Sequence, residues 1–353
     1  MSRFRRASLG PGFGYVPGEQ PKDAGWLKLN TNEAPLPPSP AVAGAVAAAA
    51  AELQRYPDPH GEPLRGALAR YHGVATDQVF VANGADQVLD CCYRAFAEPG
   101  EAVVHASPSY TLFPVLARVF SVRDVTIPLA RDGAIPDAFA VTPAPLRFVV
   151  NPNSPTGVWL EPAMLEQRLE LAQGIVVIDE AYADFAPESA VSLLSRHPTW
   201  LVARTFSKGY ALAGLRVGYA VGDRDVIADL LAVKDSYPVD RCALAGATAA
   251  LEDEPHHRRI VETVVTQRAR LTDALLALGW DVLPSRANFV FARPPAPLTA
   301  AAVAEELRAR HVLVRHFRQP ELDERLRITV GDSAAVDRFL EAVVATSVPE
   351  VAR

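Results

Sequence analysis

The chain has 353 residues, 49% of them apolar and 22% charged, enough for one large core or two ordinary ones. Its net charge of -6 argues against nucleic-acid binding, which needs an excess of Lys and Arg to neutralise phosphates. Only three cysteines without CxxC spacing, and no apolar run as long as a membrane span, favour a cytoplasmic protein that does not bind membranes.

The first part of the chain predicts an arm followed by a large α/β domain. Residues 1–35 are expected to form an N-terminal arm that packs with a smaller domain. In residues 36–240, β-branched runs alternate with helical patterns, and the runs lie at 79–81, 102–104, 148–150, 175–178 and 201–203. Apolar strands separated by helices are typical of a mostly parallel sheet covered on both faces.

The pattern changes in residues 241–353. A long helical pattern at 255–278, with charges at helical spacing, precedes short strand patterns at 288–292, 312–314 and 326–330. One long helix followed by separate short strands indicates a smaller α+β domain. We expect this domain to close over a site on the larger one.

Polar residues follow each of the five strands of the predicted large domain. Ligands of an open α/β sheet bind beyond the carboxyl ends of its strands, so these residues are expected to face one crevice. After the first strand, Gly84 precedes a helix whose free N–H groups can bind an anion. After the others come the segments 107–110, 151–157, 179–182 and 205–208, with Arg216 eight residues further on.

Each of these features alone has an ordinary explanation, because most glycine turns are only turns and most loop lysines are solvated. Together they suit one ligand with four chemical groups. Its phosphate would meet the helix start and Arg216, its aromatic ring Tyr110, its ring nitrogen Asp179 and its carbonyl Lys208. Pyridoxal phosphate carries these four groups.

The segments that carry this chemistry also resemble a known family. In order and spacing, segments 83–86, 151–157, 179–182 and 207–218 resemble those of the fold-type I, aspartate-aminotransferase-like pyridoxal-phosphate enzymes, over roughly residues 10–345. Segments 15–21, 29–33, 55–58, 234–237 and 326–331 are similar to those of the histidinol-phosphate aminotransferases. The resemblance implies an α/β fold with a mostly parallel, seven-stranded-type sheet and a smaller α+β domain. It also implies transamination of histidinol phosphate with 2-oxoglutarate.

The resemblance further implies a role for each matching residue. Lys208 would bond to the cofactor aldehyde and then shuttle the α-proton of the substrate, while Asp179 would keep the pyridine nitrogen protonated. Tyr182 would hydrogen-bond the 3′-oxygen of the cofactor. The remaining implied contacts are Tyr110 on the ring, the phosphate ligands Gly84, Ala85, Asp86, Thr205, Ser207 and Arg216, and Tyr56 reaching the phosphate of the neighbouring subunit in a homodimer.

Two positions depart from the family pattern. The family usually has Asn directly before Pro-Thr-Gly, in contact with the 3′-oxygen; here that residue is Ser154, and we expect Asn153 to reach in instead. Ala85 stands where a hydroxyl residue is frequent, so one side-chain bond to the phosphate is expected to be absent.

The substrate handle implied by the resemblance is Arg327, which would bind the carboxylate of one substrate and the phosphate of the other. Arg315 and Tyr15 are candidates for further contacts to the substrate phosphate. For Arg315, a surface charge at a strand end explains the residue equally well.

Other functions stay open or are disfavoured. An aromatic amino-acid aminotransferase is the nearest alternative, because an imidazole pocket and a phenyl pocket differ by few residues. A phosphothreonine decarboxylase-like lyase is a third reading of the same scaffold, and a non-catalytic regulator is disfavoured because Lys208, Asp179 and Arg327 are all present. No metal site is expected, and the pair His256 and His257 is predicted to be solvated.

Overall fold

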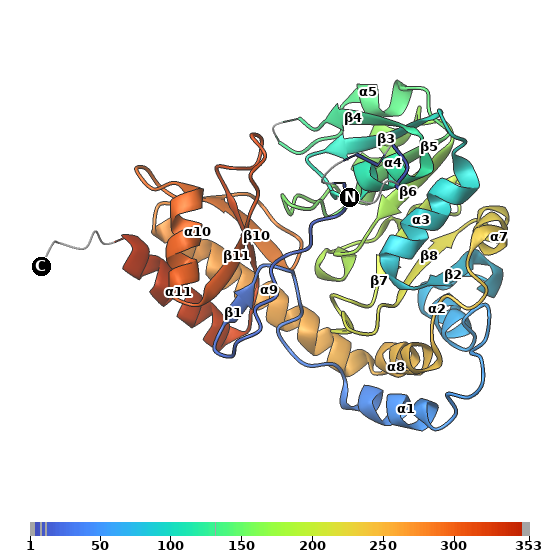
Figure 1. The fold of residues 1–353 in the computed structure, drawn as a ribbon, viewed down its shortest axis with the longest axis horizontal. Helices are drawn as coiled ribbons and strands as arrows, with labels where there is room; N and C mark the ends of the chain where they lie inside the picture. Colours follow the sequence, from blue (N-terminus) through green and yellow to red (C-terminus); the bar gives the residue numbers. More distant parts are fainter. Residues whose placement is uncertain (1–3, 8, 11–12, 131, 348–353) are drawn as a thin grey trace, which may run out of the picture.

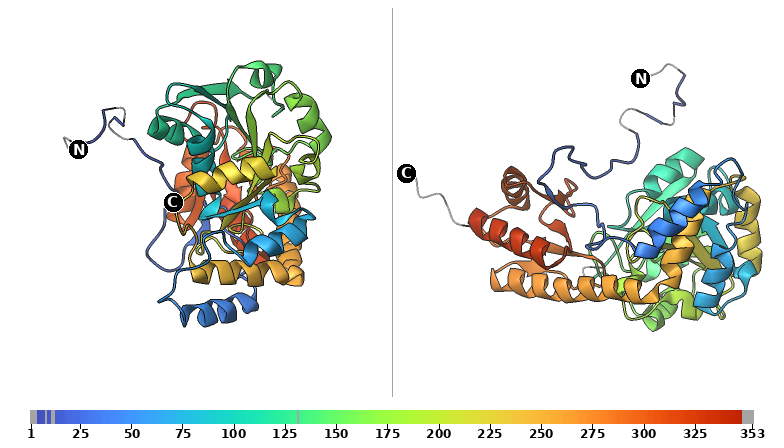
Figure 2. Two further views of the ribbon diagram at one scale, coloured as in Figure 1. Left: turned by 90° about the vertical axis from the view of Figure 1, so that its right-hand side faces the viewer. Right: turned by 90° about the horizontal axis from the view of Figure 1, so that it is seen from below.

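The computed structural model describes residues 4–7, 9–10, 13–130 and 132–347, so parts of the predicted arm and the last six residues of the predicted small domain lie outside the described residues. The chain forms two lobes, each built on its own sheet (Figure 1). Helix α9 (Glu254–Ala277) extends from beside the large lobe along the smaller one. In Figure 2, α11 (Ser333–Ser347, red) lies at the end of the molecule farthest from the large sheet.

The large lobe contains a seven-stranded sheet in the order β2-β8-β7-β6-β5-β3-β4, in which every strand except β8 runs in the same direction. The predicted mostly parallel sheet is therefore confirmed. Its strands are β2 (Val79–Ala82), β3 (Ala102–Ser107), β4 (Arg123–Pro128), β5 (Leu146–Val150), β6 (Ile175–Asp179), β7 (Trp200–Thr205) and β8 (Gly218–Gly222).

Two strands of this sheet escaped the sequence analysis. β4 lies at the edge of the sheet and is mostly exposed, so its residues lack the apolar run of a central strand. β8 begins and ends with glycine, which weakens the strand pattern.

Side chains on alternate positions of the large sheet fill two cores, one on each face. Val79 and Val81 belong to one core, whereas Phe80 belongs to the other. One face is covered by α2 (Leu64–His72), α5 (Asp137–Val141), α6 (Pro162–Leu169) and α8 (Arg241–Glu252), and the other by α3 (Gly84–Phe96), α4 (Phe113–Phe120) and α7 (Arg224–Val233). Burial on both faces is the reason that the central strands read as continuous apolar runs.

The smaller lobe contains a five-stranded sheet in the order β1-β11-β12-β10-β9. Its strands are β1 (Leu27–Leu29), β9 (Asp281–Val282), β10 (Phe289–Arg293), β11 (Val312–His316) and β12 (Leu326–Thr329), packed against α9, α10 (Ala300–Ala309) and α11. β1 pairs with β11 in parallel, so the N-terminal segment joins a sheet otherwise made of residues beyond 280.

The connections between the lobes bear on the predicted domain division. α1 (Pro40–Ala50) and α2 both pack against α8, so the first helix after the predicted boundary at 240 and 241 contacts the large lobe. The division into residues 1–35, 36–240 and 241–353 stays a prediction. Short 3-10 turns complete the fold as η1 (Thr76–Gln78), η2 (Ala183–Phe185) and η3 (Ala190–Leu193).

The predicted solvation of the two adjacent histidines is wrong. His256 is only 8% exposed, and its Nε2 lies 2.9 Å from the carbonyl oxygen of Pro37. His257 stacks on Tyr210, with ring centroids 4.1 Å apart. His256 is buried and His257 is largely covered because α9 packs against the large lobe. The described residues contain no cluster of His, Cys, Asp and Glu suited to a metal ion. No helix in the described part of the chain has the length and apolarity needed to cross a membrane.

Candidate active site

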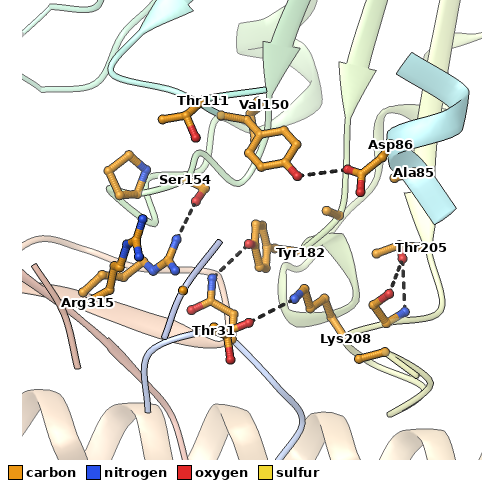
Figure 3. Close-up of a pocket in the computed structure, with 18 of the residues that line it drawn as sticks. Thr31, Ala85, Asp86, Thr111, Val150, Ser154, Tyr182, Thr205, Lys208 and Arg315 are labelled. Atoms are coloured by element: carbon orange, nitrogen blue, oxygen red, sulfur yellow. Dashed lines mark hydrogen bonds between the residues drawn. The ribbon is translucent and has the colours of Figure 1, made fainter. Parts of the chain in front are cut away.

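A cavity of about 360 Å³ lies at the carboxyl ends of the strands of the large sheet and is closed on its other side by residues of the smaller lobe (Figure 3). All five strand ends singled out in the sequence contribute to it. The large lobe supplies Ala85, Asp86, Tyr110, Ser154, Asp179, Tyr182, Thr205, Ser207, Lys208 and Arg216, and the smaller lobe and N-terminal segment supply Arg315, Arg327 and Tyr15.

Asp179 is the last residue of β6, and its side chain is almost completely buried. One carboxylate oxygen accepts a hydrogen bond of 3.0 Å from the backbone N–H of Ala181. Burial raises the pKa of Asp179 to about 7, because the carboxylate loses its contact with water. A cationic ring N–H placed beside this buried carboxyl group would stabilise its charged form.

We expect the Asp179→Asn variant of the cofactor-free protein to be more stable than the parent at neutral pH. Between about pH 4 and pH 7, the unfolded parent has lost a proton that the folded parent keeps, so the parent's free energy of unfolding falls as the pH rises. The loss is a few kcal/mol, at about 1.4 kcal/mol per pKa unit. Asparagine cannot ionise and keeps an oxygen for the Ala181 N–H.

Urea unfolding of both cofactor-free proteins at about pH 5 and about pH 8 measures this effect. The gap in the free energy of unfolding must widen at the higher pH. An equal gap at both pH values would mean that the Asp179 carboxyl does not titrate in this range.

Lys208 follows β7 through Thr205 and Ser207, and its side chain is half-buried in the cavity. Its Nζ donates to the backbone carbonyl of Thr31 at 3.4 Å and lies 6.0 Å from the ring centroid of Tyr182. Burial lowers the pKa of Lys208, and the positive charges of Arg327 and Arg216 act in the same direction. The amine is therefore neutral, and nucleophilic, more often than a solvated lysine.

The N-terminus of α3 and Arg216 form an anion-binding corner of the cavity. Gly84 has a φ of +78°, and a Cβ at this position would lie 2.8 Å from Nη2 of Arg216. A Cβ on Gly218 would lie 2.3 Å from the backbone nitrogen of Ala85. The two glycines thus let the free N–H groups of α3 and the guanidinium approach the same point.

Hydroxyl groups complete this corner. Ser207 Oγ lies 3.0 Å from Thr205 Oγ1 and 3.5 Å from Nη1 of Arg216. The carboxylate of Asp86 accepts hydrogen bonds from Nη2 of Arg216 at 3.0 Å and from the Tyr110 hydroxyl at 2.9 Å. The Asp86 side chain therefore orients two other site residues, and only its backbone N–H is suited to an anion.

Arg327 extends from β12 into the opposite side of the cavity. Its Nη1 donates to Ser154 Oγ at 3.2 Å and its Nη2 to the carbonyl of Asn30 at 3.1 Å. Its Nε is buried and has no hydrogen-bond partner among the described residues. Burial lowers the pKa of Arg327, and a bound anion would reverse this effect and satisfy the free N–H.

Two predicted side chains, those of Tyr56 and Asn153, do not line the cavity. Tyr56 is 77% exposed and stacks on Tyr237, outside the cavity of its own chain. The amide of Asn153 donates to Pro108 and Thr156, and Asn153 does not line the cavity. Ser154 does line it, so the geometry favours Ser154 over Asn153 beside a ligand.

The two proposed phosphate contacts, Arg315 and Tyr15, both line the cavity. The guanidinium of Arg315 donates to the backbone carbonyls of Val16 at 3.4 Å and Pro17 at 3.5 Å, so it holds the N-terminal segment in place. Tyr15 meets Tyr110 edge-on, with ring centroids 6.0 Å apart. Both residues lie at the mouth of the cavity rather than at its floor.

Residues 30–32, which follow β1, also belong to the site, although no role for them was predicted from the sequence. These three successive residues contact Arg327, Lys208 and Tyr182, through the carbonyls of Asn30 and Thr31 and the side chain of Asn32. Their position within segment 29–33, one of the segments that resemble the family, was the indication in the sequence that they could belong to the site. Nothing local assigned them a role, because their partners stand 150 or more residues away in the chain.

The residues present fit pyridoxal phosphate. The α3 N-terminus and Arg216 suit its phosphate, the buried carboxyl of Asp179 suits a protonated ring nitrogen, and the amine of Lys208 suits its aldehyde. Tyr110 presents its ring to the cavity, and Tyr182 presents a hydroxyl group.

Comparisons with known proteins agree with this chemistry. Residues 24–343 match the family model "Aminotransferase class I and II". The chain is 45% identical over 347 residues to a histidinol-phosphate aminotransferase of Bradyrhizobium diazoefficiens, covering 97% of this chain and 99% of the relative. It is 27% identical to the crystal structure of the histidinol-phosphate aminotransferase of Sinorhizobium meliloti in complex with pyridoxal-5′-phosphate, with a TM-score of 0.83 and 90% of each chain covered. An aspartate aminotransferase of Thermus thermophilus superposes with a TM-score of 0.74 at 25% identity, covering 90% of this chain and 91% of that one.

Proposed function

The chain belongs to the class I and II aminotransferase family, and on that premise we propose that its cavity transfers the amino group of histidinol phosphate to 2-oxoglutarate. The products are imidazole acetol phosphate and glutamate, in a step of histidine biosynthesis. The chain is a pyridoxal-phosphate-dependent enzyme with the fold of the aspartate-aminotransferase-like group. When bound, the cofactor supplies the electron sink that lets the amino-bearing carbon lose its proton.

The observation that carries this proposal is that three ionisable side chains meet in one cavity. Lys208 has a lowered pKa, Asp179 has a raised pKa, and Arg327 has an N–H group without a partner in the described part of the chain. Ionisable groups whose pKa values are shifted in opposite directions within one cavity are typical of acid–base chemistry.

Each residue then has a defined task. Lys208 would hold the cofactor through its Nζ and afterwards accept the proton from the amino-bearing carbon of the substrate. Asp179 would keep the ring nitrogen protonated, and Tyr182 would donate its hydroxyl proton to the 3′-oxygen. Thr205, Ser207, Arg216 and the N–H groups of Ala85 and Asp86 would bind the phosphate. Tyr110 would cover one face of the ring.

Arg327 would bind the anionic end of each substrate in turn. Its planar guanidinium can donate two hydrogen bonds to a carboxylate or to a phosphate. This suits an enzyme that binds histidinol phosphate and glutamate in one site. Arg315 and Tyr15, at the mouth of the cavity, would add contacts to the phosphate of histidinol phosphate.

Single half-reactions test the substrate. The loaded enzyme is mixed separately with histidinol phosphate, phenylalanine and phosphothreonine, and conversion of the cofactor to its amine form is followed by absorption. We expect conversion with histidinol phosphate well above that with phenylalanine, and no carbon dioxide from phosphothreonine. Conversion by phenylalanine alone would make the enzyme an aromatic aminotransferase, and release of carbon dioxide would make it a lyase.

We also infer a homodimer in which Tyr56 contacts the cofactor phosphate of the partner subunit. Tyr56 and Tyr237 stack at 4.5 Å while both remain exposed, as does the nearby Leu53. An exposed group of apolar side chains of this kind favours an interface.

Cys91 and Cys92 are neighbours in the sequence, and both are buried free thiols, which is consistent with a cytoplasmic enzyme.

Subunit mixing tests the shared site. Tyr56→Ala and Lys208→Ala chains are each expected to have little activity alone. When the two chains are unfolded together in equal amounts and refolded, half of the dimers contain one chain of each kind. Each of these dimers has one of its two sites free of both substitutions, so about a quarter of the parental activity should return. No recovery, with dimers present in the mixture, would place Tyr56 in the site of its own chain or outside any site.

A further inference from the structure

Asn32 is a fully engaged polar residue at the junction of the two lobes. It is only 1% exposed, and its φ of +56° lies in the left-handed region, which Asn tolerates. Its side-chain Nδ2 donates to the hydroxyl oxygen of Tyr182 at 2.9 Å. Its Oδ1 accepts from the Thr329 hydroxyl at 3.1 Å, and its carbonyl accepts from the amide of Asn288 at 3.0 Å.

The hydroxyl group of Thr329 makes two hydrogen bonds with Asn32. Thr329 Oγ1 accepts from the backbone N–H of Asn32 at 3.0 Å, and its single proton is then donated to Oδ1 of Asn32. The amide nitrogen of Asn32 consequently faces Tyr182. Because the Tyr182 oxygen accepts this N–H, its own proton is free to point into the cavity.

We propose that Asn32 is a positioning residue that directs the hydroxyl proton of Tyr182 toward the cofactor and ties Tyr182 to the strand that carries Arg327. This inference rests on the proposed function, in which Tyr182 donates to the 3′-oxygen. In this proposal Asn32, which also lines the cavity, acts through its hydrogen bond to Tyr182.

The position of Thr329 gives the second part of the proposal. Thr329 lies on β12 two residues after Arg327, while Tyr182 follows β6 in the other sheet. The chain Tyr182–Asn32–Thr329 therefore joins the cofactor side of the cavity to the substrate side through buried hydrogen bonds. Buried side-chain bonds of this kind hold their partners firmly, because a broken bond leaves polar groups without water.

Two substitutions at residue 32 separate the effects of the side chain and the backbone. Asn32→Gly removes the amide and accommodates the left-handed φ without strain. Asn32→Asp keeps the shape, but its carboxylate can only accept, so it would turn the Tyr182 proton away from the cavity. Each variant is compared with Tyr182→Phe and with the corresponding double variant.

The measured quantity is the dissociation constant of pyridoxal phosphate from the cofactor-free protein, determined by titration. We expect Asn32→Gly to weaken binding about tenfold in the parent and less than twofold in the Tyr182→Phe background, as for residues that act through each other. Asn32→Asp should weaken it at least as much. Thr329→Val should resemble Asn32→Gly, whereas Thr329→Ser, which keeps the hydroxyl group, should resemble the parent.

An equal loss from Asn32→Gly in both backgrounds would overturn the inference, since Asn32 would then act through the fold alone. Unchanged binding in Asn32→Gly would overturn it as well, and so would unchanged binding in Tyr182→Phe, which removes the group Asn32 is said to direct. Unchanged binding in Tyr182→Phe would also remove the proposed contact of Tyr182 with the 3′-oxygen. None of these outcomes touches the proposed reaction, which fails instead if the parent does not bind pyridoxal phosphate or does not convert histidinol phosphate.

Discussion

Replacing Lys208 by alanine is expected to abolish both the covalent attachment of the cofactor and measurable turnover. The variant loses the only amine placed in the described cavity, and with it the base that moves the α-proton. General acid–base catalysis alone contributes about 10²–10⁴-fold, and loss of the covalent bond adds to this. We therefore expect a decrease in kcat of at least about 10⁴-fold, together with loss of the visible absorption of lysine-bound pyridoxal phosphate.

The control for this prediction is Lys22→Ala, which removes an exposed lysine near the N-terminus and should leave both readouts unchanged. Lys208→Arg separates charge from chemistry, because it keeps a cation in the cavity but cannot act as a neutral nucleophile. It should be as inactive as Lys208→Ala. Substantial turnover in either Lys208 variant would contradict the assignment of Lys208 as the cofactor-binding base.

Replacing Arg327 by alanine is expected to lower kcat/KM by about 10²–10³-fold for both substrates, as expected when one partner of a buried charged contact is removed. The effect should be large for two reasons. The substrate anion loses its partner, and Ser154 Oγ and the carbonyl of Asn30 lose the donors that satisfy them. Arg327→Lys should recover only part of the loss, since an ammonium group cannot form the bidentate contact.

Separate measurement of the two half-reactions makes this prediction specific. Both substrates are anionic, so both half-reactions should slow. If the reaction of glutamate slowed while that of histidinol phosphate did not, the phosphate of histidinol phosphate would bind elsewhere, and Arg315 would be the next residue to replace. Arg310→Lys, on the exposed end of α10, serves as the matched control and should have no effect.

The two predictions concern opposite sides of one cavity, and the structure shows how those sides are joined. Lys208 follows a strand of the large sheet and Arg327 lies on a strand of the smaller one, yet each donates to a backbone carbonyl of the segment 30–32. A displacement of this segment would therefore move both residues. Loss of the Asn32 side chain tests a third contact of this segment, the one to Tyr182, and removes neither of the other two.

Much of the fold was determined by local sequence. The central strands of the large sheet are buried on both faces, so their apolar runs identified them, and the residues after them pointed to one edge of the sheet. The spacing of the segments around Lys208 and Asp179 identified the family, because the covalent chemistry of the cofactor restricts which residues can stand there. Strand β4 was missed because an exposed edge strand does not need that apolar pattern.

Only the tertiary structure decided which polar groups meet. The sequence favoured Asn153 over Ser154, but in the fold the amide of Asn153 donates to Pro108 and Thr156, and Ser154 faces Arg327. The fold also stacks His257 on Tyr210, although the neighbouring residues of the helix are charged. Asn32 received no role until the two lobes were placed together. The physical reason is the same in each case: a specific contact requires a partner in the right place, and here that partner lies on a distant part of the chain.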